Sequence, residues 1–234
     1  MSRPPADLIL IAGPIGNLGD ITPRAREALE ASSFVIAEDS RVTGRLLQLL
    51  EIKKPLTVLN DHTSAAKIDA LVTRIAEEGP ACLLTDAGTP GISDPGALLV
   101  EAGVAAGLEI DALPGASAVT TALSLSGFFA QRFAFLGFLP KKPGPVAEVL
   151  KPFVDSSLTL VLFESPFRVL KTLEFCEAVL GDRRVAICRE LTKMHQQVWR
   201  TSLSKRPTEK DVPMKGEFTI VIEGKRRANQ SSEE

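Results

Sequence analysis

The segment Ala81-Cys82-Leu83-Leu84-Thr85-Asp86-Ala87-Gly88-Thr89-Pro90-Gly91-Ile92-Ser93-Asp94-Pro95-Gly96 decides the fold of this chain. Its first four residues form a short apolar run that predicts a buried strand. Asp94 and Pro95 suit the N-cap and the first position of a following helix. A plain strand-to-helix connection needs only a few residues. The many Gly, Pro and Asp residues therefore favour a ligand-binding loop over an ordinary tight turn, because small residues let a ligand approach the backbone.

Strand and helix patterns alternate along the first half of the chain. Apolar runs predict strands at 8–12, 34–37, 56–59, 81–84 and 109–113. Apolar residues at three- and four-residue spacing predict helices at 23–31 (capped by Thr22), 43–50, 65–78 and 98–106. This alternation predicts an α/β domain whose parallel sheet has helices on both faces. Ligands of such sheets bind at the carboxyl ends of the strands.

The pattern changes after Gly127. Strands are expected at 133–138, 158–163, 185–188, 198–203 and 218–222, with a turn-rich connection at 140–145 and a helix from 166 to 180. A polar, Pro-interrupted spacer joins the last two strands and leaves no room for a crossover helix, which favours antiparallel pairing in a mixed sheet. We expect an N-terminal α/β domain at 1–127, an α+β domain at 128–224 and a disordered polar tail at 225–234.

The composition gives no general attraction for nucleic acid. The 234 residues carry a formal net charge of −2, and 44% of them are hydrophobic, enough for a sizeable core. Any contact with RNA would depend on local basic groups. The sequence offers five: Lys53-Lys54, Lys141-Lys142, Arg183-Arg184, Lys205-Arg206 and Lys225-Arg226-Arg227.

Cysteine usage and hydropathy indicate a cytoplasmic protein. Cys82, Cys176 and Cys188 are odd in number and widely spaced, and no CxxC occurs. With two histidines in the chain, no metal site is expected. The residues before the first strand lack the apolar core of a signal peptide, and the longest uncharged stretch, 112–130, is interrupted by Pro and Gly. We therefore expect no membrane span.

Chemistry is expected at the strand ends. Glu38, Asp39 and Arg41 follow the second predicted strand. They form either a solvated strand end or a carboxylate–guanidinium pair held in a cleft, and we interpret them as catalytic residues that face the substrate. Gly13-Pro14-Ile15-Gly16-Asn17 follows the first strand and matches neither a dinucleotide nor a P-loop motif. Pro114-Gly115-Ala116-Ser117-Ala118 follows the fifth, so two small-residue loops would line one pocket if the fourth and fifth strands are neighbours.

Seven blocks, taken in order, resemble the tetrapyrrole (precorrin/corrin) methylase superfamily, in the branch that methylates ribosomal RNA. The blocks lie at 14–17, 38–41, 86–96, 114–118, 163–166, 189–193 and 215–218. The resemblance covers the chain from about Asp7 to Gly224. Gly13 and Ser40 stand where this branch usually has Thr, and Phe163 stands where Tyr is common.

The resemblance implies a two-domain enzyme that binds S-adenosylmethionine between its domains, largely through backbone groups. The cofactor residues it implies are Pro14, Gly16, Asp86, Ala87, Gly88, Thr89, Ile92, Ser93, Pro114, Ser117, Ala118, Phe163, Glu190, Leu191, Gly216 and Glu217. It also implies methylation of the ribose 2′-oxygen of a cytidine in the 16S rRNA of the small ribosomal subunit, and a homodimer.

Two other function classes stay open at this point. One is a small-molecule methylase that acts on a tetrapyrrole, as the wider superfamily does. The other is a module that binds an adenosyl compound or RNA without catalysis. The blocks at 14–17 and 38–41 favour the ribosomal branch. Methylation of a hydroxyl requires alignment of donor and acceptor and removal of a proton, and the sequence assigns no residue as the base.

Overall fold

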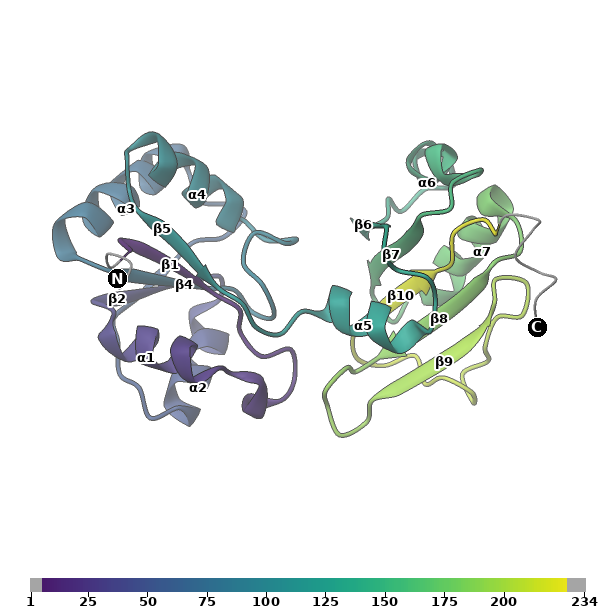
Figure 1. The fold of residues 1–234 in the computed structure, drawn as a ribbon, viewed down its shortest axis with the longest axis horizontal. Coiled ribbons are helices and arrows are strands. Elements are labelled where there is room, and N and C mark those ends of the chain that lie inside the picture. Colours follow the sequence, from purple (N-terminus) through teal and green to yellow (C-terminus); the bar gives the residue numbers. More distant parts are fainter. Residues whose placement is uncertain (1–5, 227–234) are drawn as a thin grey trace. The chain divides into compact units, whose positions relative to one another are not determined.

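The computed structural model describes residues 6–226, and the chain divides into two compact units, Met1–Ser117 and Ala118–Glu234 (Figure 1). From residue 227 on, the predicted disordered tail lies outside the described residues. Lys225, expected to begin that tail, is instead held in place, because its backbone N–H donates to the Ser156 carbonyl at 2.7 Å. No helix within 6–226 has the length and apolar character needed to cross a bilayer.

The first unit is a five-stranded parallel sheet in the order β3-β2-β4-β1-β5. Its elements are β1 Leu8–Ile11, the 3-10 helix η1 Leu18–Asp20, α1 Pro23–Ala31, β2 Phe34–Ala37, α2 Ser40–Leu49, β3 Leu56–Val58, α3 Ala65–Glu78, β4 Ala81–Leu84, α4 Gly96–Ala105 and β5 Ile110–Leu113. The predicted α/β fold class is confirmed. Each predicted strand and helix of this unit is present, with ends shifted by up to three residues.

Helices cover both faces of this sheet (Figure 1). In β4, Leu83 packs with Ile75 of α3 and Leu99 of α4, whereas the next residue, Leu84, packs with Leu29 of α1. Successive strand residues point to opposite faces, so a strand between two helix layers reads as a continuous apolar run. That is the pattern of 81–84.

The connections around β1 and β4 meet the topological condition for a crevice at the carboxyl edge of the sheet. β1 leads to α1 on one face, and its neighbour β4 leads to α4 on the other. Loops that leave adjacent strands in opposite directions open a ligand-binding crevice between them. β4 and β5 are not neighbours, because β1 lies between them. The two small-residue loops therefore follow strands that are not adjacent, with the loop after β1 leaving from the strand between them.

The second unit is a mixed sheet in the order β6-β7-β10-β8-β9. Its elements are α5 Ala118–Ser126, β6 Phe133–Phe138, α6 Pro143–Leu150, the 3-10 helix η2 Lys151–Phe153, β7 Thr159–Glu164, α7 Val169–Leu180, β8 Arg184–Arg189, β9 Gln197–Ser202 and β10 Phe218–Ile222. β6 and β7 pair in parallel, and the other neighbours pair in antiparallel fashion. The prediction of a mixed sheet is confirmed.

Two expectations for this unit are wrong. β9 and β10 do not pair with each other: β8 lies between them and is antiparallel to both. The long polar spacer carries the chain past β8, so that β10 enters the sheet beside β7. The connection predicted at 140–145 contains the start of α6. Pro143 and Pro145 read as turn residues, but they occupy the first turn of a helix, where a missing N–H costs nothing.

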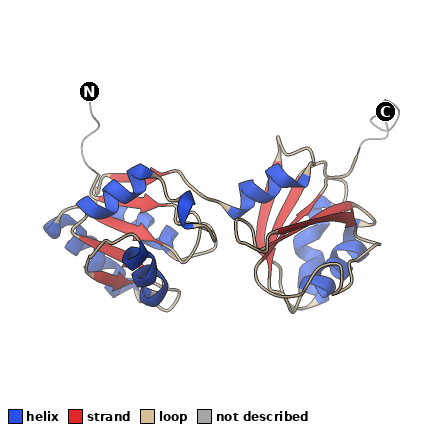
Figure 2. Cartoon of the chain, turned by 90° about the horizontal axis from the view of Figure 1, so that it is seen from below, coloured by secondary structure: helices blue, strands red, loops and turns tan. Residues whose placement is uncertain are grey.

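Helix α5 packs on the second sheet, whereas the predicted boundary at residue 127 assigns it to the first domain. Arg200 of β9 donates to the carbonyls of Leu125 and Ser126 at the end of α5. Its pairing partner Ala186 lies on the same face, while the adjacent Ile187 packs in the core under α6 and α7. The helices of this unit thus lie on both faces of its sheet (Figure 2).

Candidate functional site

Three small-residue loops interlock at the carboxyl edge of the first sheet. The N–H of Gly13 donates to the carbonyl of Gly88 at 2.9 Å, and the N–H of Gly88 donates to the carbonyl of Gly13 at 3.2 Å. The Thr89 hydroxyl donates to the Ala116 carbonyl at 3.4 Å. The loop after β4 thus bonds to the loops after β1 and β5, although β4 and β5 are not adjacent.

Gly88 and Gly115 are glycine for different structural reasons. Gly88 has a φ of +79°, in the left-handed region that side-chain-bearing residues seldom adopt. Gly115 lies against β1, where a Cβ would come within 3.0 Å of the Ala12 Cβ. Glycine is therefore required at 88 by the backbone and at 115 by packing. Both requirements bring main-chain atoms close together at the crevice.

Asp94 shapes the tip of the loop after β4. Its carboxylate accepts hydrogen bonds from the N–H groups of Gly91 at 2.9 Å, Ile92 at 3.0 Å and Gly96 at 2.8 Å. Pro95 is the N-cap of α4 rather than its first residue, so the helix begins at Gly96. Asp94 still bonds the first turn, as expected of a capping carboxylate. The tip is held by these bonds with the Ile92 side chain exposed.

An acidic cluster joins the loops after β2 and β4. The N–H of Asp86 donates to a Glu38 carboxylate oxygen at 3.2 Å, and the N–H of Asp39 donates to an Asp86 carboxylate oxygen at 3.1 Å. Asp39 also caps α2 and forms an ion pair with Arg41 at 2.6 Å. The Arg41 side chain is 89% exposed, so its guanidinium can reach a molecule outside the crevice.

The carboxylates of this cluster differ in their electrostatics. Burial raises the pKa of Glu38, and the nearby charges of Asp86, Asp94 and Asp61 raise it further against the hydrogen bond from Asp86. Burial likewise raises the pKa of Asp86. Hydrogen bonds from Arg41 lower the pKa of Asp39 to about 2. Asp39 is thus held as a carboxylate, whereas protonation of Glu38 and Asp86 is favoured by their surroundings.

At the edge of the second sheet where β8 ends and β10 begins, Glu190 and Glu217 form a hydrogen-bonded network with Lys193. The N–H of Glu190 donates to the Glu217 carbonyl, and the N–H of Glu217 donates to the Glu190 carboxylate, each at 2.9 Å. The Lys193 ammonium bonds both carboxylates, at 3.0 and 2.8 Å. Gly216, at φ +85°, packs so closely on the Glu190 carboxyl that no Cβ would fit.

The charges of Glu190, Glu217 and Lys193 stabilise one another. Burial acts to raise the pKa of Glu190, but hydrogen bonds from Glu217 and Lys193 outweigh it and hold that pKa below its ordinary value. Burial opposes the charge of Lys193 as well, yet its two carboxylate partners raise its pKa. Lys193 lies in the sequence block at 189–193 that carries the family resemblance, but it is not one of the predicted cofactor residues.

Aromatic side chains lie at the end of β7, which pairs with β10. Phe163, near the end of β7, contacts Phe135 and Phe138 edge to face, with ring centroids 4.8 and 5.8 Å apart. Phe163 is half-buried and offers apolar surface at this edge. Leu191 is buried, so its backbone and not its side chain is available to a ligand.

The predicted site residues gather at the carboxyl edge of the first sheet and, in the second sheet, at the edge where β7 and β8 end and β10 begins. Those of the first unit are Pro14, Gly16, Glu38, Asp39, Arg41, Asp86, Ala87, Gly88, Thr89, Ile92, Ser93, Pro114 and Ser117. Those of the second are Phe163, Glu190, Leu191, Gly216 and Glu217, with Ala118 opening α5. Sequence reasoning missed Thr85, whose buried hydroxyl has no hydrogen-bond partner in the described part of the chain.

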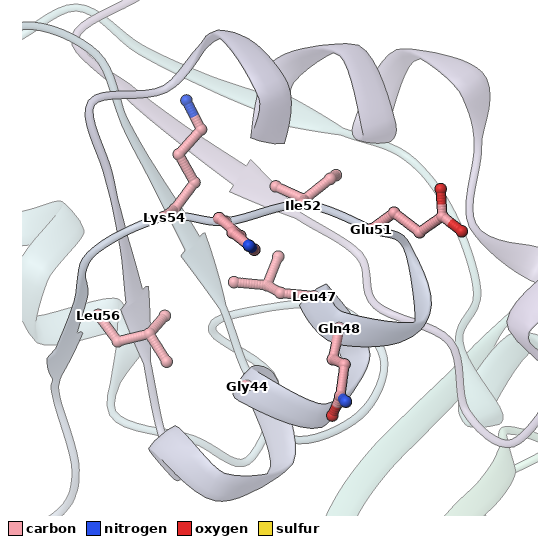
Figure 3. A pocket seen from close by; sticks show the side chains of 8 residues that line it. Gly44, Leu47, Gln48, Glu51, Ile52, Lys54 and Leu56 are labelled. Carbon is pink, nitrogen blue, oxygen red and sulfur yellow. The ribbon is translucent and has the colours of Figure 1, made fainter.

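A different hollow of the first unit, of about 530 Å³, lies between α2 and β3. It is lined by the apolar side chains of Leu47, Ile52 and Leu56 (Figure 3). The Lys54 ammonium donates to two carbonyls at the end of α1, at 2.6 and 2.7 Å. Arg41 lies at the start of α2, at the carboxyl edge of the sheet. Because α2 runs from there toward the amino edge, this hollow lies nearer the amino edge than Arg41 does.

Comparison with known proteins gives one consistent family. The family model described as Tetrapyrrole (Corrin/Porphyrin) Methylases matches residues 7–206. Proteins named Ribosomal RNA small subunit methyltransferase I from Synechocystis sp. and Thermotoga maritima are each 42% identical over 220 residues, which is 93% of this chain and 78% and 98% of theirs.

A solved structure shares the fold. The crystal structure of uroporphyrin-III-C-methyltransferase from Thermus thermophilus matches 92% of this chain and 93% of its own chain, with a TM-score of 0.65 and 20% identity. At that identity the likeness concerns the fold alone. The matches agree with the resemblance drawn from the seven sequence blocks.

The raised pKa of Glu38 predicts a pH-dependent effect of Glu38→Gln. The stabilising contribution of protonated Glu38 is fully present below the ordinary pKa of 4.5 and is lost as the pH rises through the higher folded-state pKa. At pH 7.5 the ionised carboxylate destabilises the folded state. The free energy of unfolding of the variant should therefore be about 0.5 kcal/mol larger than that of the parent. Urea unfolding at pH 7.5 and near pH 4.5 measures the gain and its disappearance.

Glu77→Gln on the exposed face of α3 is the control, because it changes the net charge equally outside the cluster. A gain of the same size in this control, or destabilisation of Glu38→Gln at pH 7.5, would contradict the electrostatic account of the cluster.

Proposed function

This chain belongs to the tetrapyrrole (corrin/porphyrin) methylase family, and from that premise we propose that it is an RNA methyltransferase that acts on small-subunit ribosomal RNA. The observation that carries the proposal is the set of interlocked loops around Gly88, together with 42% identity to proteins that bear the name of that activity. The methyl donor is S-adenosylmethionine.

The residues at the crevice suit this donor. S-adenosylmethionine has amino, carboxylate and ribose hydroxyl groups that backbone amides and carbonyls can recognise. The loop after β4 brings main chain to the crevice through Gly88 and Gly91, both at positive φ, and exposes Asp86 and Ala87. The hydroxyl of Thr85, which has no hydrogen-bond partner within residues 6–226, lies directly before them. A loop of this composition provides the close backbone approach that such a ligand needs.

The residues that we propose for the donor are those that the family resemblance implies. In the first unit they are Pro14, Gly16, Asp86, Ala87, Gly88, Thr89, Ile92, Ser93, Pro114 and Ser117. In the second they are Ala118, Phe163, Glu190, Leu191, Gly216 and Glu217, where Phe163 adds an apolar surface suited to an adenine ring. When bound, S-adenosylmethionine supplies an electrophilic methyl group on its sulfonium sulfur.

The acidic cluster would act on the acceptor. Arg41, fixed through Asp39 and 89% exposed, is placed to bind a phosphate of the RNA strand. Glu38 and Asp86, whose pKa values are raised, are better proton acceptors than Asp39. One of them would take the proton of the attacking hydroxyl. Asp39 would remain ionised and hold Arg41 in position.

The acceptor in this proposal is the ribose 2′-oxygen of a cytidine in 16S rRNA, presented by the small ribosomal subunit in the cytoplasm. The 42% identity to two rRNA methyltransferases, against 20% to a tetrapyrrole methylase structure, favours RNA over a tetrapyrrole. The homodimer and the absence of a metal requirement stay predictions.

Methyl transfer tests the proposal directly. The purified protein is incubated with S-adenosylmethionine labelled in its methyl group and with small ribosomal subunits that lack the modification. The label is then located by nuclease digestion and mass spectrometry. We expect it on a ribose of 16S rRNA. Transfer to a tetrapyrrole such as uroporphyrinogen but not to subunits, or no transfer to either, would overturn the assignment.

Gly88→Ala should weaken the binding of S-adenosylmethionine, and this loss should exceed that of a control variant with the same loss of stability. The positive φ makes alanine cost about 1–2 kcal/mol of stability. Gly107, at φ +80° after α4, has nothing within 4 Å of a Cβ and lies outside the crevice. Gly107→Ala should therefore lose similar stability and keep its affinity. Calorimetric titration with S-adenosylmethionine, paired with urea unfolding, separates the two; equal affinity in both variants would show that the loop is only a turn.

Arg41→Ala should reduce methylation of small subunits by about 100-fold, because a misplaced acceptor loses alignment with the donor. Its affinity for S-adenosylmethionine should stay within about twofold of the parent, since Arg41 is 89% exposed and its ion pair is with Asp39, which is not among the proposed donor residues. Arg45→Ala, one turn further along α2 and also exposed, is the matched control and should retain activity. Full turnover by Arg41→Ala, or a parallel loss of donor binding, would remove this residue from the acceptor side.

A further inference from the structure

Basic pairs that are far apart in the sequence meet at one edge of the second sheet. Arg183 and Arg184 stand at the start of β8, Lys205 follows β9, and Lys225 and Arg226 follow β10. Since β9 and β10 are both antiparallel to β8, they end where β8 begins. Three of the five basic groups of the sequence thus share this edge.

Arg200 of β9 completes this group. We refer to Arg183, Arg184, Arg200, Lys205, Lys225 and Arg226 together as the basic edge. Two hollows share Arg184: one of about 470 Å³ is also lined by Arg200 and Lys205, and one of about 440 Å³ is also lined by Arg183, Lys225 and Arg226.

Carboxylates neutralise only part of this charge. Glu223 pairs with Arg184 and Arg226, and Asp155 pairs with Lys225 at 2.5 Å. Asp182 accepts from the N–H and hydroxyl of Ser204, at 2.9 and 2.7 Å. Six cations therefore face three carboxylates among the described residues that line or border the two hollows. The surface has an excess of positive charge in a chain whose net charge is −2.

Arg183 adds a buried charge behind the second hollow. It is 8% exposed, and its Nη2 donates to the carbonyls of Phe153 and Val154 at 2.9 and 2.7 Å. Its Nη1 has no hydrogen-bond partner, and no carboxylate forms an ion pair with it in the described part of the chain. The Asp155 carboxylate attracts the Arg183 charge but forms its ion pair with Lys225, so the buried cation still adds positive potential to the hollow beside it.

The arginines of the first hollow are held in place by the protein. Arg200 donates to the carbonyls of Leu125 and Ser126 at the end of α5. Arg184 stacks its guanidinium over the Phe128 ring, 4.9 Å from the centroid. Side chains that are ordered before binding lose less entropy when a ligand arrives. Thr201 and Ser202 also line this hollow, and residues of this kind commonly contact phosphate oxygens.

We propose that the basic edge binds the phosphate backbone of small-subunit rRNA at a distance from the nucleotide that is methylated. This inference rests on the proposed function for the identity of the RNA. Within the second unit, Glu190 lies at the opposite end of β8 from Arg184, and a six-residue strand spans about 20 Å. The edge therefore serves docking and does not touch the donor residues of that unit. Phosphate contacts fix register and orientation and release counterions, which accounts for RNA binding by an acidic chain.

Charge reversal tests this docking surface. In Lys205→Glu/Lys225→Glu/Arg226→Glu, all three side chains are exposed. The variant should bind purified small subunits at least about tenfold more weakly near 0.1 M salt, and the slope of log K against log salt should become about three units shallower. kcat and the Kd for S-adenosylmethionine should match the parent, so the loss appears in KM for subunits. The triple alanine variant should show a smaller loss in the same direction.

The matched control is Lys67→Glu/Lys171→Glu/Lys210→Glu, which makes the same charge change at exposed positions elsewhere. It should bind subunits within about twofold of the parent, because distant surface charges are screened. Thermal unfolding confirms that each variant is folded.

The outcomes separate this inference from the proposed function. A parent protein that binds subunits through the basic edge but transfers no methyl group would refute the proposed function and leave the docking surface standing. Unchanged affinity and salt slope in the reversal variant, or an equal loss in the control, would overturn the docking surface. Binding of the parent to vesicles of anionic phospholipid but not to subunits would overturn it as well.

Discussion

The reciprocal pair of backbone hydrogen bonds between Gly13 and Gly88 is the constraint on which the candidate site depends. It joins the loops that leave β1 and β4 toward opposite faces of the sheet, and it requires main-chain approach that the left-handed conformation of Gly88 permits. With these loops tied together, the Thr89 hydroxyl reaches the loop after β5, and Asp86 reaches the loop after β2. Four strand ends thereby form one surface.

The two ends of the strands have different electrostatic roles. At the carboxyl edges, carboxylates are placed by backbone hydrogen bonds, and their pKa values are moved in opposite directions by burial and by Arg41. At the edge of the second sheet where β8 begins and β9 and β10 end, cations outnumber carboxylates, and Arg183 is buried and forms no ion pair within residues 6–226. Positioned carboxylates suit proton transfer, and excess cations suit a phosphate backbone. The proposed catalysis and the proposed docking therefore depend on separate surfaces of the protein.

Much of the fold follows from local patterns in the sequence. α1 begins at Pro23 after its cap Thr22, as predicted, because both residues favour a helix start. The start of α6 was missed because Pro143 and Pro145 are equally typical of a turn. The position of β10 could not be predicted, since strand order depends on packing between distant segments.

The candidate site shows the same limits. The loops after β1, β2, β4 and β5 were found from small and charged residues at strand ends, but the unpartnered hydroxyl of Thr85 leaves no mark in the sequence. The bond from Lys193 to Glu217 and the meeting of Arg184 with Lys225 depend on strand pairing and not on neighbouring residues.

Hydrogen exchange of backbone amides with and without S-adenosylmethionine tests the central claim most directly. We predict slower exchange at residues 86–91 and 13–16 with no change at 183–184. Protection that avoids the Gly88 loop, or that is strongest at the basic edge, would contradict the account.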